Sequence, residues 1–185
     1  FPTDGSTLMT SKVEDAVNSG VSFIISAGNS AEMHWQGNYV DTDDDGWHEF
    51  APEDEGLSIY VTHDRYLSGS PIVVFLMWAD LPSDYVNDFD LSLIGPEGDI
   101  VTYSSNVQSH KDYAFEWVSF IPNDVGTYHI GITCLLCDAM YPPPDILEIF
   151  SKTDLLEYHT KASSVTVPTD ADGAIVVGAI YHADD

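Results

Sequence analysis

The amino-acid sequence predicts a mainly β protein in which an antiparallel, jelly-roll-like β-sandwich is inserted into a small α/β element of one helix and two parallel strands. Three observations carry this prediction. A helical segment followed by an apolar run stands near the N-terminus, short β-rich runs separated by turn residues fill the middle, and a second apolar run stands near the C-terminus. The outer pattern is typical of α/β structure and the middle pattern of a sandwich.

The first part of the α/β element is predicted between Thr7 and Ala27. Ser6 or Thr7 can cap a helix that ends before Gly20. Its apolar residues recur at helical spacing, and they are Leu8, Met9, Val13, Ala16 and Val17. The following run, Val21 to Ala27, is almost continuously apolar, as expected of a parallel strand buried on both faces.

The sandwich is predicted from about seven short strands between Gly37 and Phe150. Strong turn signals, Gly95 to Asp99 and Pro122 to Gly126, separate some of them. The strands are Leu57 to Thr62, Ile72 to Trp78, Phe89 to Ile94, Ile100 to Tyr103, Phe115 to Phe120, Thr127 to Thr133 and Ile146 to Phe150. After Pro168, Ala174 to Ile180 again has the pattern of a doubly buried strand. The predicted limits are therefore 1–30 and 161–185 for the α/β element and 31–160 for the sandwich.

The sequence is strongly acidic. The 185 residues include 31 Asp and Glu against 5 Lys and Arg, a formal net charge of -26. This excludes a nucleic-acid binder, which needs clustered cations to neutralise phosphates. A hydrophobic fraction of 44% is enough for a folded core. No apolar run approaches the roughly 18 residues of a membrane span, and because the first residue is Phe1 we expect an excised or processed chain.

The only cysteines are Cys134 and Cys137, in a single C-x-x-C. A structural zinc site needs four ligands, and the sequence holds no second pair. A local disulfide and two free thiols both remain open.

The two outer segments resemble the subtilase family of subtilisin-like serine peptidases. Val13 to Ser30 is similar to the family's helix and strand that end in Ala-Gly-Asn, and Ser164 to Ile180 is similar to the Pro-containing loop and core strand that follow. The resemblance implies that Asn29 is the oxyanion donor and that Val167–Pro168 is cis. It also implies that small residues wall the primary specificity pocket, namely Ser26, Ala27 and Gly28.

The middle segment resembles the pre-peptidase C-terminal and P-domain-like sandwiches that accompany secreted peptidases. The similar stretches are Trp78 to Asp80, Asn87 to Leu93, Gly95 to Asp99 and Asp124 to Tyr128. Some subtilases carry such a module after the oxyanion Asn, with stretches like His34 to Gly37 and Asp41 to Gly46 at its entrance. The resemblance thus implies a fragment of a secreted subtilisin-like serine endopeptidase, with the rest of that chain and a peptide or protein substrate as partners.

Two acidic segments are candidate calcium sites. Asp41 to Gly46 has the Asp-x-Asp-x-Asp-Gly form of a calcium loop, in which alternate carboxylates gather on one side of a turn. The ligands of this first loop would be Asp41, Asp43, Asp45, the Trp47 carbonyl and Glu49. Pro52 at the twelfth position excludes an EF-hand, and a solvated acidic turn is the alternative. The second cluster, for which hydrogen-bonded turns are the alternative, comprises Asp80, Asp84, Asn87, Asp88 and Asp90.

A donor such as Asn29 cannot cleave a peptide by itself. The family's Asp-x-Gly, His-Gly-Thr and Gly-Thr-Ser-Met-Ala segments are absent from the sequence, so we expect no hydrolysis by this chain alone. The competing hypothesis is a free-standing, calcium-dependent β-sandwich for adhesion or ligand binding. It predicts that the two outer strands are antiparallel edges of the sandwich, whereas the peptidase hypothesis predicts that they pair in parallel beneath the helix.

Overall fold

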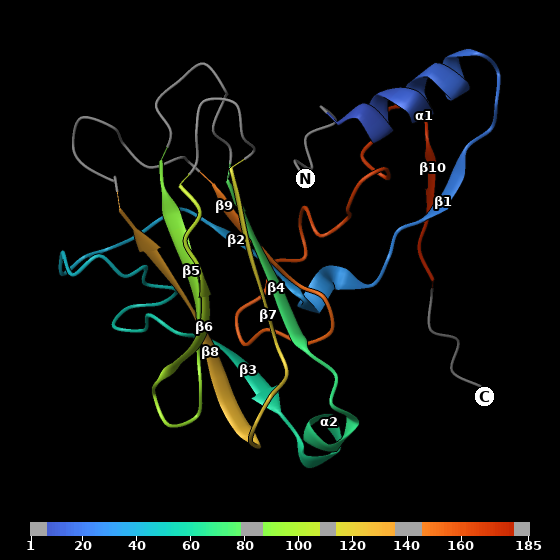
Figure 1. Ribbon diagram of the computed structural model, residues 1–185. Coiled ribbons are helices and arrows are strands. Elements are labelled where there is room, and N and C mark those ends of the chain that lie inside the picture. The colour runs from blue at the N-terminus through green and yellow to red at the C-terminus, as the bar shows by residue number, and fades with distance from the viewer. Residues whose placement is uncertain (1–6, 79–86, 108–113, 136–145, 180–185) are drawn as a thin grey trace.

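The computed structural model describes residues 7–78, 87–107, 114–135 and 146–179. It has two parts: a small element of α1, β1 and β10, and a two-sheet sandwich (Figure 1). The predicted fold class, a mainly β protein with antiparallel sheets and one small parallel pair, is confirmed. None of the helices in the described ranges has the length and apolar character needed to cross a membrane.

Helix α1 spans Leu8–Asn18, close to the predicted range. Thr7 is its N-cap, and the Thr7 side chain accepts a hydrogen bond of 3.1 Å from the backbone N–H of Thr10. At the other end the chain turns away at Gly20, whose φ of +89° is favourable only for glycine. Val13 is buried, but Leu8 and Met9 are 75% and 58% exposed, so the apolar spacing marks the packed face of the helix only in part.

Strand β1 (Ile24–Ser26) pairs in parallel with β10 (Ile175–Val177). The register sets Ile24 opposite Ile175, and the pair is extended by a hydrogen bond of 2.9 Å from the Ala27 N–H to the Val177 carbonyl. The Thr10 hydroxyl donates to Asp170 over 3.0 Å, which ties α1 to the loop that leads into β10. The parallel arrangement predicted by the peptidase hypothesis is therefore present.

The expectation that these two strands are buried on both faces is wrong for the described residues. Ile24 is 67% exposed, and every residue of β10 is exposed, including Ile175 at 53%. The reason is that the described sheet contains only two strands, so its apolar side chains have no neighbouring strands or second layer to pack against.

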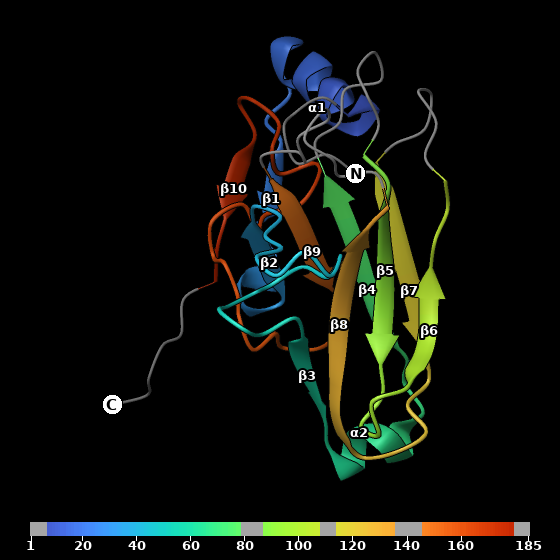
Figure 2. The same ribbon diagram turned by 90° about the vertical axis from the view of Figure 1, so that its left-hand side faces the viewer.

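The sandwich consists of two four-stranded sheets packed face to face. In Figure 1 the two sheets lie side by side, and in Figure 2 they are seen face-on, one in front of the other. The first sheet has the order β2-β9-β4-β7, and its strands are His34–Gly37, Leu147–Ser151, Ile72–Trp78 and Phe115–Phe120. The second has the order β3-β8-β5-β6, and its strands are Leu57–Val61, Gly126–Cys134, Phe89–Ile94 and Ile100–Ser104. All pairs in both sheets are antiparallel.

The core lies between these sheets and follows the period-2 alternation of the strands. Leu57 and Ile59 of β3 are fully buried, as are Val74 and Leu76 of β4. Burial of each such side chain contributes about 1.5–3 kcal/mol. Tyr128 is also buried, and its hydroxyl donates to Asn123 within the turn before β8.

Two elements were not predicted from the sequence. Strand β2 has no alternating apolar pattern and forms because His34 to Gly37 pairs with β9. Helix α2 (His63–Ser68) begins at the Thr62 cap and ends at Gly69, which is left-handed with φ +62°. A short 3-10 helix, η1 (Ser30–Glu32), lies just before β2 in the chain and joins the α/β element to the sandwich. Cys134, at the end of β8, is disulfide-bonded, while Cys137 lies outside the described residues.

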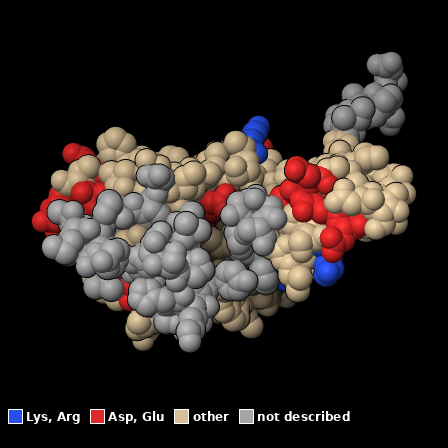
Figure 3. All heavy atoms as spheres, turned by 90° about the horizontal axis from the view of Figure 1, so that it is seen from above, with Lys and Arg blue, Asp and Glu red and all other residues tan. Residues whose placement is uncertain are grey.

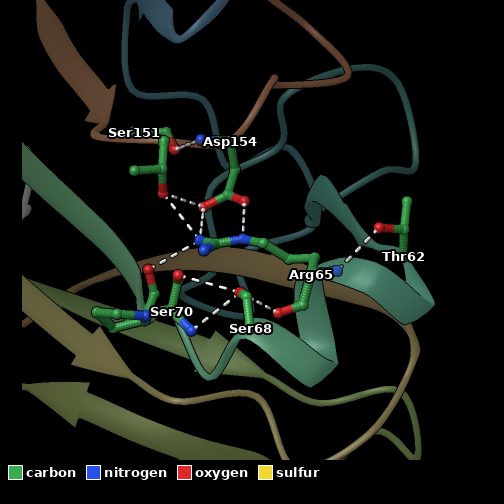
Figure 4. A network of polar contacts seen from close by, with 8 residues as sticks. Thr62, Arg65, Ser68, Ser70, Ser151 and Asp154 are labelled. Atoms are coloured by element: carbon green, nitrogen blue, oxygen red, sulfur yellow. Dashed lines mark hydrogen bonds and ion pairs between the residues drawn. The ribbon is translucent and has the colours of Figure 1, made fainter.

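Helix α2 is fixed to the sandwich by Arg65. Its guanidinium donates from Nε and Nη2 to the two carboxylate oxygens of Asp154, over 3.1 and 3.0 Å, and also to the Pro71 carbonyl and the Thr153 hydroxyl (Figure 4). Asp154 is buried, and its backbone N–H donates a hydrogen bond of 3.0 Å to the Ser151 hydroxyl. This bidentate ion pair between Arg65 and Asp154 holds the segment after β9 against the connection between β3 and β4.

We predict that Arg65→Lys lowers the free energy of unfolding by about 1–3 kcal/mol, because a lysine cannot reproduce the planar double contact with buried Asp154. Urea denaturation measures the change. Asp64→Asn, an exposed substitution in the same helix, is the control and should change stability by less than about 0.5 kcal/mol. Equal stabilities of Arg65→Lys and the unmodified chain would contradict the assigned role.

Candidate functional site

The parallel strands β1 and β10 end at a shallow hollow of about 530 Å³. Ligand sites of open parallel sheets commonly lie at the carboxyl ends of the strands, and this hollow occupies that place. It brings together three residues of the predicted site, Ser26, Gly28 and Asn29, with the segment after β10. The lining residues are Ile24, Ile25, Ser26, Gly28, Asn29, Val177, Gly178 and Ala179.

Asn29 stands at the junction of the two parts of the fold. It is exposed, occupies the cap position before η1 with φ -139°, and makes no capping hydrogen bond with its side chain. Gly28 before it has φ +81°, and a Cβ there would meet no atom within 4 Å. The amide of Asn29 is therefore held at the hollow by its backbone while its side chain takes no part in helix capping.

Two further predictions concern the surroundings of Asn29. The Val167–Pro168 peptide bond is cis, as the resemblance implied. Ser26 is exposed at the end of β1, and Ala27 is half-buried and bonded to Val177. These positions agree with a small-residue wall, and their role in binding a substrate stays a prediction.

The polar side chains in the described lining of the hollow can donate and accept hydrogen bonds. Ser26 and Asn29 supply polar side chains, and the described lining contains no His, Asp, Glu or Lys. A serine hydroxyl without an adjacent base is a weak nucleophile. The hollow can thus stabilise a negatively charged oxygen but has no base of its own to generate an attacking group.

The first acidic loop does gather its carboxylates. Ligand oxygens of Asp41, Asp43 and Asp45 all lie within 4.8 Å of one another. Asp41 accepts backbone hydrogen bonds from Asp44, Asp45 and Gly46, at 2.8 to 3.2 Å, so it closes the turn. Hard carboxylate oxygens at this spacing suit Ca²⁺. The two other predicted ligands are engaged nearby: the Trp47 N–H donates to Asp45, and Glu49 accepts from Thr42.

The loop creates a strong local negative field. The pKa of Tyr39 is raised to about 12, first by burial and then by the charges of Asp41 and Asp45. The pKa of Glu55 is also raised, by desolvation and then by Asp45 and the other loop carboxylates. A bound cation would relieve this repulsion.

The second acidic cluster is only partly described. Asn87 and Asp88 are buried at the start of β5, and burial together with Asp88 and Glu116 raises the pKa of half-buried Asp90. Asp80 and Asp84 lie outside the described residues. A metal site at this cluster stays a prediction.

Sequence reasoning missed a buried histidine beneath the first loop. His48 is 1% exposed and packs among aromatic rings, including Trp35 and Phe50. Its Nδ1 lies 3.0 Å from the Val40 amide nitrogen and 3.1 Å from the Val40 carbonyl oxygen, which fixes the two stems of the loop together. Burial lowers its pKa to about 4, so the imidazole is neutral in the folded protein. The only signal in the sequence was its position among aromatic residues.

The fold is shared with a much longer protease. The structure of the Clostridium perfringens CspB protease matches 98% of this chain with a TM-score of 0.62 and 12% sequence identity, and the chain spans 39% of that protein's length. No protein-family model matches the sequence, and no curated protein matches it either. The likeness therefore establishes that this fold occurs as part of a protease, and the activity is a separate matter.

We predict that His48 makes stability depend on pH. Because its folded pKa of about 4 lies below the ordinary value of about 6.5, its contribution is complete above pH 6.5 and is lost as pH falls toward 4, by about 3 kcal/mol at most. His48→Gln should flatten the rise in unfolding free energy between pH 5 and 6.5, measured by urea denaturation. Exposed His63→Gln is the control and should keep the slope. A His48→Gln slope equal to that of the unmodified chain would refute the assignment.

Proposed function

We propose that this chain is part of a secreted subtilisin-like serine endopeptidase, in which Asn29 donates the side-chain hydrogen bond to the oxyanion of the tetrahedral intermediate. The observation that carries the proposal is the parallel register of β1 and β10, which sets Asn29 beside the final strand at a shared hollow. The resemblance of both flanking segments to subtilases and the fold of the protease neighbour support the same function.

The sandwich has a defined place in this proposal. All eight of its strands lie in the chain between β1 and β10, and η1 begins directly after Asn29. A substrate that reaches Asn29 therefore approaches next to the sandwich. We infer that the sandwich shapes or restricts access to the hollow of the proposed peptidase.

The rest of the catalytic machinery must come from outside these residues. The sequence lacks the family's three triad segments, and the described lining of the hollow contains no base. The exposed apolar side chains of β1 and β10 are the surface on which the remaining strands of a peptidase sheet would pack. The competing adhesion hypothesis expected these strands to be antiparallel edges of the sandwich, and their parallel pairing favours the peptidase.

A calcium ion at the first acidic loop is part of the proposal. Asp41, Asp43 and Asp45 would hold it, with the Trp47 carbonyl and Glu49 as further oxygen ligands. The ion would neutralise charge in a chain that carries a formal net charge of -26. Its role would be structural, because the loop does not contribute to the lining of the hollow at Asn29.

We predict that Asn29→Ala lowers kcat for peptide hydrolysis by about 10²–10³-fold in the full-length gene product, with little change in KM, because the donor acts mainly in the transition state. Steady-state kinetics measures both. Asn38→Ala, at another exposed asparagine, is the control and should keep kcat. The 185-residue chain alone should show no turnover. An unchanged kcat for Asn29→Ala would refute the assigned oxyanion role.

Binding of calcium to the first acidic loop is tested by thermal unfolding of the 185-residue chain. We expect the melting temperature to rise on addition of Ca²⁺ and to fall with a chelator, because an ion that binds only the folded loop stabilises it by mass action. Asp43→Asn should remove most of this shift while sparing the turn, which Asp41 and Asp45 hold. Asp99→Asn, in a distant exposed turn, should keep it. Equal melting temperatures with Ca²⁺ and with chelator would exclude the site.

A further inference from the structure

A second, larger groove of about 900 Å³ lies between helix α1 and the outer face of the first sheet. Thr7, Leu8 and Met9 of the helix start form one side, and Thr166 and Val167 also contribute. The floor comes from strands β4, β7 and β9, through Phe75, Met77, Phe115 and Phe150.

The apolar floor is not required by the core of the sandwich. On β4 the core-facing residues are Ile72, Val74 and Leu76, so alternation places Phe75 on the opposite face. That face of an antiparallel sandwich is usually polar. Here its rings form a strip: Phe75 stacks on Phe115 at 5.9 Å and on Trp117 at 6.5 Å between centroids, and Trp117 is 50% exposed on β7 at the end of the sheet.

The helix side of the groove exposes matching apolar surface. Leu8 is 75% exposed and Met9 is 58% exposed, although Val13, one turn after Met9, is buried. Large contiguous apolar surfaces of this kind commonly mark interaction sites. A ligand between α1 and the sheet would bury these side chains and the aromatic strip together.

The groove also carries positive charge, which is scarce in this protein. Lys12 and Lys152 both line it, out of 5 Lys and Arg in the whole sequence. Lys12 shares its charge with Asp15 through a pair of 3.2 Å between exposed groups, whereas Lys152 follows β9 at the rim and is exposed. Figure 3 shows the contrast, with several patches of acidic atoms on the visible face and few basic atoms.

The groove and the candidate site are separate, but residues adjacent in the chain line them. Ser30 lines the groove, and Asn29, the preceding residue, lines the hollow at the end of β1. Val167, which also lines the groove, forms the cis bond with Pro168 in the loop that leads toward β10.

We infer that this groove binds an extended segment of the protein substrate in which large apolar side chains alternate with carboxylates. The apolar side chains contact Phe75, Met77 and Phe115, and the carboxylates face Lys152 and Lys12. That the bound segment belongs to a protein substrate rests on the proposed function. That the groove binds a peptide of this chemistry rests only on the residues of the groove.

The test uses fluorescein-labelled peptides in which Leu and Phe alternate with Glu, with Gln and Lys versions of the same sequence. Binding to the 185-residue chain is followed by fluorescence anisotropy at physiological ionic strength. We expect the Glu version to bind more tightly than the Gln version despite the acidity of the chain. We expect Leu8→Glu to weaken binding of the Glu version about tenfold, because the complex loses one leucine that the peptide would bury. We expect Lys152→Glu to weaken it about three- to fivefold, because an exposed charge pair is lost.

Matched controls separate the groove from general effects. Leu67→Glu changes a leucine that is 67% exposed on α2, and Lys161→Glu reverses a charge at another exposed lysine. Both should leave binding of the Glu version unchanged. The inference is overturned if no peptide binds, if the Gln version binds as tightly as the Glu version, or if the control substitutions weaken binding as much as Leu8→Glu and Lys152→Glu do.

The outcomes also separate this inference from the proposed function. Asn29→Ala should not alter peptide affinity, because its side chain lines the hollow and not the groove. If peptides bind as expected but Asn29→Ala keeps full kcat in the gene product, the peptidase proposal fails and a peptide-binding groove stands. If Asn29→Ala lowers kcat but no peptide binds, only the groove inference fails.

Discussion

The interaction on which the candidate site depends is the parallel hydrogen bonding between β1 and β10. It joins Ile24–Ser26 to Ile175–Val177, strands separated by almost the whole described chain. Loop closure over such a distance is entropically unfavourable, and three-residue strands offer few bonds of their own. The contacts that make the pairing possible lie on either side of it: α1 is tied to the loop before β10 through Thr10 and Asp170, and the sandwich brings the two connecting segments together.

The sandwich and the α/β element bury their apolar side chains to different extents. In the sandwich, alternating residues form a closed core between two sheets, and the apolar side chains of β3, β5 and β8 lie mainly on the core face, whereas β4 is apolar on both faces. In β10 all three residues are apolar and exposed, and in β1 Ile24 is exposed while Ile25 is half-buried. This difference in burial distinguishes a part of the fold that is complete in itself from a part whose pattern is suited to a larger sheet, and it agrees with a fold that occupies 39% of the protease neighbour.

Much of the fold followed from local patterns. Three sandwich strands, Ile72–Trp78, Phe89–Ile94 and Phe115–Phe120, have the predicted limits, because alternation and flanking turns specify them. Strand β2 was missed because its pairing with β9 is a tertiary contact with no signal in His34 to Gly37. The role of Asn29 stays a prediction from the resemblance, and the structure adds the segment after β10 beside it. The aromatic strip on the outer face of β4 and β7 was beyond sequence reasoning, since a strand pattern does not show which face is covered.

The way the chain enters and leaves the sandwich has a consequence for how such a protein can arise. The entering strand β2 lies next to the leaving strand β9, with His34 opposite Phe150, and the chain after β9 returns to β2 through hydrogen bonds from Thr160 to His34. Entry and exit therefore stand side by side, as they do where one domain is tolerated inside another. A module with adjacent ends can be gained, lost or exchanged during evolution by lengthening a single surface connection, without disturbing the strands that flank it. The same geometry makes it a natural unit for transplantation between scaffolds.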